Sequence, residues 1–104
     1  MAKGFGSPPK NTPLGYILIL IPDMNIYACE DKGYISFTNS LDMARIWRKK
    51  SAIQKVLGGY AESIVEDYYQ GRAEEINMQI AELYRNKKGD LQTKIIQDVV
   101  LIKK

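Results

Sequence analysis

The apolar run from Tyr16 to Ile21 most constrains the fold, because all of its side chains are large and apolar and it lies between Gly15 and Pro22. A short apolar run between such residues predicts a buried β-strand. The run is far shorter than the roughly 20 residues that a membrane-spanning helix needs. It also ends in Pro-Asp-Met rather than in the small residues of a signal-peptide cleavage site, so we expect a cytoplasmic protein that does not contact a membrane.

Three further segments have the composition of strands. Turn residues at 22–25 favour a hairpin between the first strand and a second at 25–29. Gly33 allows a turn before a third strand at 34–38. The C-terminal segment 93–104 predicts a last strand with apolar residues on both faces, which indicates an interior strand or an edge strand covered by another element.

The middle of the chain has the composition of helices. Asn39 or Ser40 can cap a first helix, and Ser51, followed three residues later by glutamine, can form the capping box of a second. The spacing of apolar residues then predicts one long helix near residues 60–85. Its apolar stripe consists of Val65, Tyr69, Ala73, Ile76, Ile80 and Leu83. Such a helix would be longer than the predicted strands, so its stripe would need a partner. The alternative is that Gly71 divides the segment into two helices that pack on the same core.

These elements predict a single α+β domain preceded by a tail. A chain of 104 residues fits one domain. Residues 1–13 are rich in proline, carry two lysines and predict a flexible basic N-terminal tail, whereas residues 14–104 form the domain. We expect a small, mainly antiparallel sheet in the chain order β-β-β-α-α-β, with the helices on one face.

The stretch 42–59 places a tryptophan among five cations. On a helix, Trp47 falls near the centre of an apolar arc, whereas the cations of residues 45–49 fall on the opposite arc. A single-strand binder needs its rings beside its cations, so we expect Trp47 to pack against the sheet while the cations face water. The alternative is a weak nucleic-acid-binding protein that uses this basic face and the tail. Its contacts would be Arg45, Arg48, Lys49, Lys3 and Lys10.

Charge is divided unevenly between two neighbouring segments. Residues 40–57 carry one acid and five bases, whereas residues 60–84 carry six acids and one base, Arg72. Exposed ion pairs within one molecule would stabilise it by less than about 1 kcal/mol each. The alternative is that the basic segment of one molecule pairs with the acidic segment of another, which would give head-to-tail self-association.

The residues that enzymes and metal sites need are largely missing. The chain has no histidine and one cysteine, Cys29, which leaves no imidazole for base catalysis or zinc binding and no internal disulfide. Glu74 and Glu75 are adjacent, and adjacent residues on a helix diverge by about 100°, so they do not form a catalytic pair. No glycine-rich phosphate-binding loop occurs. We therefore expect a protein that is not an enzyme and has no metal, cofactor or small-molecule site.

Tyrosine is frequent on the long predicted helix, and this residue is enriched where proteins meet. Core packing is the simpler explanation for Tyr69, which belongs to the main stripe, whereas Tyr68 lies on a flanking stripe that can serve a second neighbour. We expect the helix to bind a protein partner or a second copy of the chain in a homodimer. The predicted contacts are Tyr68, Tyr69, Ile76, Ile80, Leu83 and Tyr84.

One motif resembles a known group of sequences. The predicted hairpin is followed by a threonine, a leucine, an alanine, an aromatic residue, a basic pair and a second alanine-bearing helix. The positions are Thr38, Leu41, Ala44, Trp47, Arg48, Lys49 and Ala52. This pattern is similar to that of a loose class of small phage and bacterial proteins, and the opening MAKGFG resembles the starts of small cyanobacterial proteins. The resemblance concerns the fold and transfers no functional residue. We expect a small accessory or inhibitor-like protein that acts by binding another protein and is related to phages or mobile elements. The segment 60–86 departs from the class pattern, so we expect any distinctive role to lie there.

Overall fold

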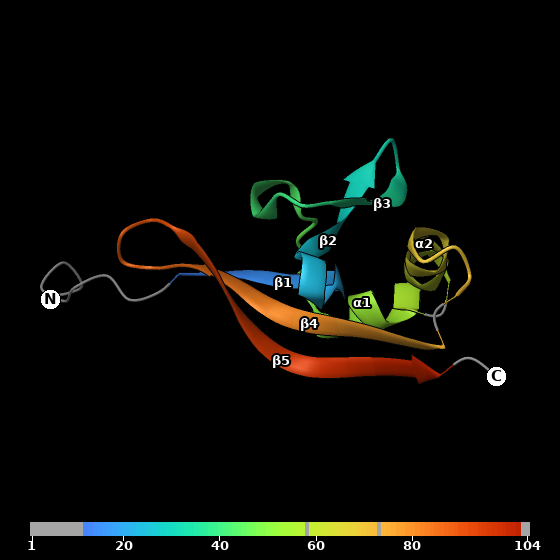
Figure 1. The fold of residues 1–104 in the computed structure, drawn as a ribbon. Coiled ribbons are helices and arrows are strands. Elements are labelled where there is room, and N and C mark those ends of the chain that lie inside the picture. Colours follow the sequence, from blue (N-terminus) through green and yellow to red (C-terminus); the bar gives the residue numbers. More distant parts are fainter. Residues whose placement is uncertain (1–11, 58, 73, 103–104) are drawn as a thin grey trace, which may run out of the picture.

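The computed structural model describes residues 12–57, 59–72 and 74–102, apart from the side chains of Thr12 and Tyr60 (Figure 1). Within these residues the chain forms a five-stranded antiparallel sheet, in the spatial order β3-β2-β1-β4-β5, and two α-helices. The strands are β1 (Thr12–Ile21), β2 (Ile26–Asp31), β3 (Tyr34–Thr38), β4 (Glu75–Arg85) and β5 (Leu91–Ile102). The helices are α1 (Lys50–Leu57) and α2 (Tyr60–Tyr68), and two short 3-10 helices are η2 (Pro22–Met24) and η3 (Leu41–Met43). The predicted α+β class and antiparallel sheet are confirmed. Residues 1–11 of the predicted tail lie outside the described residues, whereas Thr12 and Pro13 already belong to β1.

The central strand β1 is buried on both faces, as its uninterrupted apolar run predicts. Leu18 and Leu20 belong to the larger core cluster, which also contains Ile53 of α1 and Val65 of α2. Ile17, on the opposite face, belongs to a second cluster with residues of β4 and of the segment after η3. Both helices therefore cover one face of the sheet, and a short irregular segment covers part of the other.

The predicted long helix over 60–85 is wrong. Helix α2 ends at Tyr68, and Gln70 and Gly71 then adopt positive φ angles of 57° and 74°. The segment from Glu75 to Arg85 is strand β4, which pairs with β1 on one side and with β5 on the other. Its buried positions largely alternate, as in a strand with one covered face. The chain order is therefore β-β-β-α-α-β-β rather than the predicted β-β-β-α-α-β. The strand is more stable than a helix here because the two neighbouring strands hydrogen-bond its backbone groups. Its apolar side chains also enter the core that β1 lines.

The first predicted helix, which Asn39 or Ser40 would cap, is also wrong. Only the single turn η3 forms, and Ala44 has extended angles of φ −63° and ψ 140°. The N–H groups of Tyr16 and Trp47 each donate to the other's carbonyl at 2.8 Å, and the Arg45 N–H donates to the Ala28 carbonyl at 2.9 Å. The extended segment 44–47 thus fills the gap where β2, which pairs with β1 only near Ile19 and Ile21, has diverged from it. Long-range backbone hydrogen bonds here outweigh local helix propensity.

The second predicted helix is confirmed within one residue, because α1 begins at Lys50 rather than at Ser51. Trp47 is buried, as expected, although the strand-like bridge to Tyr16 places it there rather than a helix face. In Figure 1 both helices lie near the C-terminal end of β5, and the turn between β4 and β5 lies at the other end of the molecule.

Candidate protein-binding surfaces

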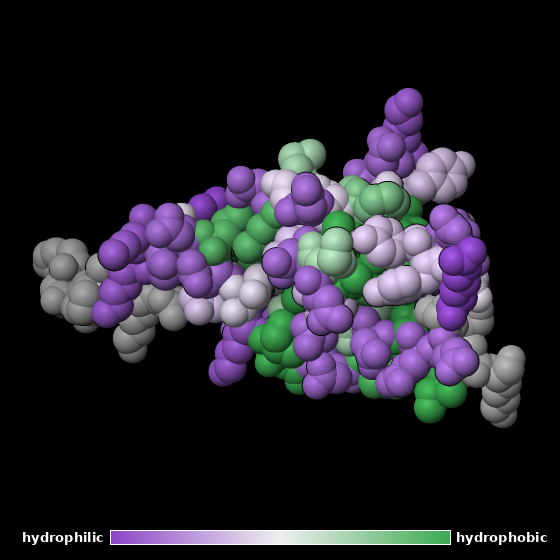
Figure 2. Space-filling model, viewed as in Figure 1, coloured by the Kyte–Doolittle hydropathy of each residue, from purple (hydrophilic) through white to green (hydrophobic). Residues whose placement is uncertain are grey.

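The outer edge of β5 is open. β5 is the last strand of the sheet, and no strand of the described chain pairs with its outer side. Four apolar side chains on this strand are exposed, and the most exposed keeps 74% of its surface accessible. They are Ile95, Ile96, Val100 and Ile102. Figure 2 shows apolar side chains in green at intervals along this edge, between hydrophilic ones. The sequence predicts an interior or covered strand at 93–104, whereas β5 is an edge strand whose outer side is not covered by any strand of the described residues.

An irregularity at Ile96 divides β5 into two parts. Ile80 pairs with Gln97 and Ala81 pairs with Ile95, so Ile96 is the extra residue of a bulge. After the bulge the side chains change faces: Val99 packs against the larger core cluster, whereas Leu91, before the bulge, packs against the smaller one. The regular, continuous part of the edge is therefore Gln97–Ile102.

This regular part carries little charge. Asp98 is its only ionised side chain, and its carboxylate Oδ1 accepts a hydrogen bond of 3.0 Å from Nε2 of Gln79 on β4. The four residues that follow, Val99 to Ile102, are all apolar. Long, apolar and unprotected edges are the part of a sheet that another chain pairs with most readily.

Three of the predicted partner-binding residues do not face solvent. Ile76, Ile80 and Leu83 are buried in the core because they belong to β4 and not to an amphipathic helix. These three residues therefore belong to the core and do not form the interface that a helix would have presented.

The three predicted tyrosines do not form one surface. Tyr68 and Tyr69 are exposed at the end of α2, and their ring centroids lie 5.2 Å apart in an edge-to-face arrangement. Tyr84 is half-buried on β4 and pairs with Pro13 at the start of β1. A role for these tyrosines in binding stays a prediction.

A shallow apolar groove lies between β3 and α2. Its volume is about 240 Å³, and its walls come from neighbouring residues of the two elements. They are Ile35, Ser36, Phe37, Ile64, Asp67 and Tyr68. Of these residues only Tyr68 belongs to the predicted contacts, because the groove depends on how the β2–β3 hairpin packs against α2.

A larger and more polar hollow of about 440 Å³ is lined by residues of η2, β4 and β5. Asp23, Glu75 and Asp98 contribute carboxylates to its wall, and Tyr69 contributes a phenol. Within the described residues no group of histidine, cysteine and acidic side chains has the arrangement of a metal site. The hollow therefore provides no defined chemistry beyond negative charge.

The predicted nucleic-acid-binding cations differ in their surroundings. The guanidinium of Arg45 lies 4.9 Å from the centre of the Trp47 ring and 3.7 Å from Glu30. The prediction that ring and cations face apart is therefore wrong for Arg45, because alternate residues of an extended segment share a face. Arg48 and Lys49 are exposed, as expected. Lys3 and Lys10 lie outside the described residues, and nucleic-acid binding stays a prediction.

Cys29 is half-buried on β2. Burial raises the pKa of its thiol above the usual value, and the negative charge of Asp31 raises it further. A raised pKa keeps the group as a thiol near neutral pH, where a nucleophile needs the thiolate.

Comparison of the chain with protein-family models, curated proteins and solved structures finds no match. In the described part of the chain, no helix combines the length and the apolar character needed to cross a bilayer. The candidate surfaces therefore rest on geometry and chemistry alone.

Proposed function

We propose that this protein acts by binding protein, and that its first partner is a second copy of the same chain paired along β5. The open outer edge of β5, together with the exposed apolar side chains of the same strand, is the observation that supports the proposal most directly. Proteins usually shorten, charge or cover such an edge, because it offers free N–H and C=O groups to another strand. The stretch Val99–Ile102 carries no charged side chain, and no strand of the described residues covers its outer side.

Antiparallel pairing of two β5 strands about a two-fold axis would satisfy the edge of both copies. Two-fold dimers are the commonest homo-oligomers. With the axis near Val100, Val99 of one copy would lie opposite Leu101 of the other. Each apolar cross-strand pair would contribute about 0.2–1 kcal/mol, in addition to the new backbone hydrogen bonds. The two sheets would then form one continuous antiparallel sheet.

This surface replaces the helix as the proposed site of the homodimer, because residues 75–85 form a strand. Binding through a sheet edge suits a small accessory or inhibitor-like protein, since it needs no catalytic group and can also capture an extended segment of another protein. We propose a cytoplasmic location and a relation to phage or mobile-element proteins on the sequence evidence alone.

Sedimentation velocity over a range of concentrations tests the proposed dimer. The wild-type protein should sediment as a dimer at tens of micromolar. Val100→Lys should shift the equilibrium to the monomer by roughly tenfold or more, because it places two like charges beside the axis. Gln92→Lys makes a matched charge change at an exposed position of β5 before the bulge, and it should leave the dimer unchanged.

Two results would contradict the proposal. One is a wild-type protein that remains monomeric throughout the range. The other is a dimer that Val100→Lys and Gln92→Lys weaken equally, since general charge repulsion would then explain the effect. The circular dichroism of both variants should match that of the wild type, because both side chains are exposed.

A further inference from the structure

The geometry points to a second binding site, on the opposite edge of the sheet, for an extended peptide that carries a lysine or arginine two residues away from a small apolar residue. The site is the groove between β3 and α2. It is separate from β5, because β3 and β5 are the two opposite edges of the sheet. It therefore goes beyond the proposed dimer and stands or falls independently of it.

The backbone of β3 is available for strand addition. β3 pairs with β2 through Tyr34–Thr38 on its inner side, and no strand of the described chain pairs with its outer side. A peptide that pairs there would be extended, about five residues long and parallel or antiparallel to β3. Main-chain hydrogen bonds would hold it, and its side chains would determine specificity.

The side chains of the groove favour small apolar residues. Ile35 and Phe37 project from β3 on the face that carries Ala28 of β2, which belongs to the core beneath α2. Phe37 and Tyr68 are both exposed beside the groove, so two aromatic rings are available to a ligand. At about 240 Å³ the groove is smaller than the roughly 300–1,000 Å³ of most small-molecule sites, which favours one or two peptide side chains as the occupant.

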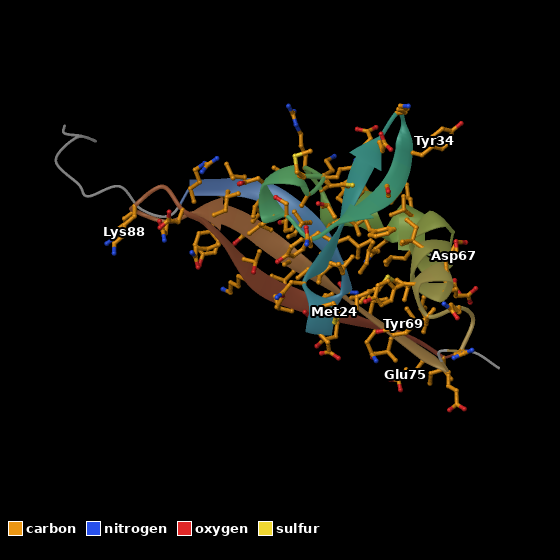
Figure 3. The ribbon with its side chains drawn as sticks, turned by 45° about the horizontal axis from the view of Figure 1, so that its top comes forward. Met24, Tyr34, Asp67, Tyr69, Glu75 and Lys88 are labelled. Carbon is orange, nitrogen blue, oxygen red and sulfur yellow. The ribbon has the colours of Figure 1, made fainter. Side chains whose placement is uncertain are left out.

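The charge around the groove selects a cation. Asp67 lines the groove, is exposed, and its carboxylate makes no ion pair or hydrogen bond within the described residues. The rest of α2 adds Glu62 and Glu66 and contains no lysine or arginine. Figure 3 shows Asp67 on α2 at the same end of the molecule as Tyr34, and Lys88 at the far end. A lysine or arginine on the α2 side of an added strand would meet Asp67, whereas an acidic residue would be repelled.

The spacing within such a peptide follows from the strand. Side chains at positions i and i+2 share a face, so the apolar residue and the cation must be two residues apart to face α2 together. The residue between them points to the other face of the sheet and needs only good strand propensity, as threonine has.

Titration of the isotope-labelled protein with two capped peptides, followed by amide chemical shifts, tests the site. The first peptide has valine and lysine two residues apart in a threonine background, and the second has glutamate in place of the lysine. The lysine peptide should bind roughly fivefold more tightly at low salt, the factor that an exposed ion pair provides. Its shifts should fall on residues 34–38 and 64–68.

Charge reversal at Asp67 provides the decisive comparison. Asp67→Lys should reverse the preference so that the glutamate peptide binds more tightly, and Asp67→Asn should remove the preference. Asp23→Lys makes the same charge change at an exposed residue of η2 and should retain the preference for lysine. Val100→Lys should leave peptide binding unchanged, which separates this site from the proposed dimer.

Several outcomes would overturn the peptide site. One is that neither peptide shifts residues 34–38, and another is that the two peptides bind equally well to the wild type. A third is that the shifts fall on β5, which would make that edge the peptide site. Shifts of residues 34–38 that grow with protein concentration in the absence of peptide would show that a second copy occupies the groove.

Discussion

At Gly15 the segment 44–47 lies directly against β1. A Cβ at this position would lie 2.6 Å from the Trp47 carbonyl oxygen and 2.6 Å from Cγ2 of Ile46. The backbone there has a φ of +143°, which side chains rarely adopt. Glycine therefore permits the hydrogen bonds between Tyr16 and Trp47 that fix this segment against the sheet.

Gly15→Ala should lower the free energy of unfolding by about 3 kcal/mol, since it combines backbone strain with two close contacts. Gly89→Ala is the matched control, because Gly89 also has a positive φ but no atom within 4 Å of its added Cβ. It should cost about 1 kcal/mol. Urea unfolding followed by Trp47 fluorescence measures both, and equal costs would show that the approach at Gly15 is not tight.

The reactivity of Cys29 should depend on Asp31. Burial and then the charge of Asp31 raise the pKa of the thiol, so the reactive thiolate is scarce at neutral pH. Asp31→Asn removes the smaller cause and should lower the pKa, which increases the rate of alkylation by iodoacetamide at a fixed pH by roughly two- to threefold. Asp90→Asn, in the β4–β5 turn, should leave the rate unchanged. An unchanged rate in Asp31→Asn would mean that burial alone controls the thiol.

At the scale of elements, β4 shows why sequence analysis fails for one segment and succeeds for others. Ile76, Ile80 and Leu83 have helical spacing, but Ile76, Met78 and Ile80 also alternate as in a strand. Glutamate, glutamine and alanine favour a helix locally. Pairing with both β1 and β5 decides the outcome, and such long-range pairing has no local signal. By contrast, β1, β3 and the start of α1 follow from short-range signals.

The candidate surfaces were predictable to different degrees. The apolar residues on both faces of β5 are visible in the sequence, but whether its edge is open depends on the strand order. The groove beside α2 needs β3 and α2 to lie together, although Tyr68 could be identified from its position outside the main stripe. The position of Arg45 over Trp47 follows from extended backbone at 44–47, which the composition of that segment does not indicate.

At the scale of the whole molecule, the two edge strands of the sheet, β3 and β5, differ in length and in the charge around them, and no strand of the described residues pairs with the outer side of either. The β5 edge is long and apolar, whereas the β3 edge is short and lies beside an acidic helix. The first suits pairing with an identical strand, and the second suits a short basic segment. Both helices lie over one face of the sheet and leave the outer sides of β3 and β5 unpaired in the described structure.

Hydrogen exchange along β5, measured at increasing protein concentration, tests the proposed pairing most directly. If two copies pair along this edge, alternate amides of Gln97–Ile102, those whose N–H groups point away from β4, should become protected as the concentration rises because they acquire partners. The amides of Tyr34–Thr38 should keep their rates, and Val100→Lys should shift the protection of β5 to a roughly tenfold higher protein concentration or beyond. Exchange in Gln97–Ile102 that stays constant up to millimolar concentration, or a dimer that protects other residues instead, would contradict pairing along β5.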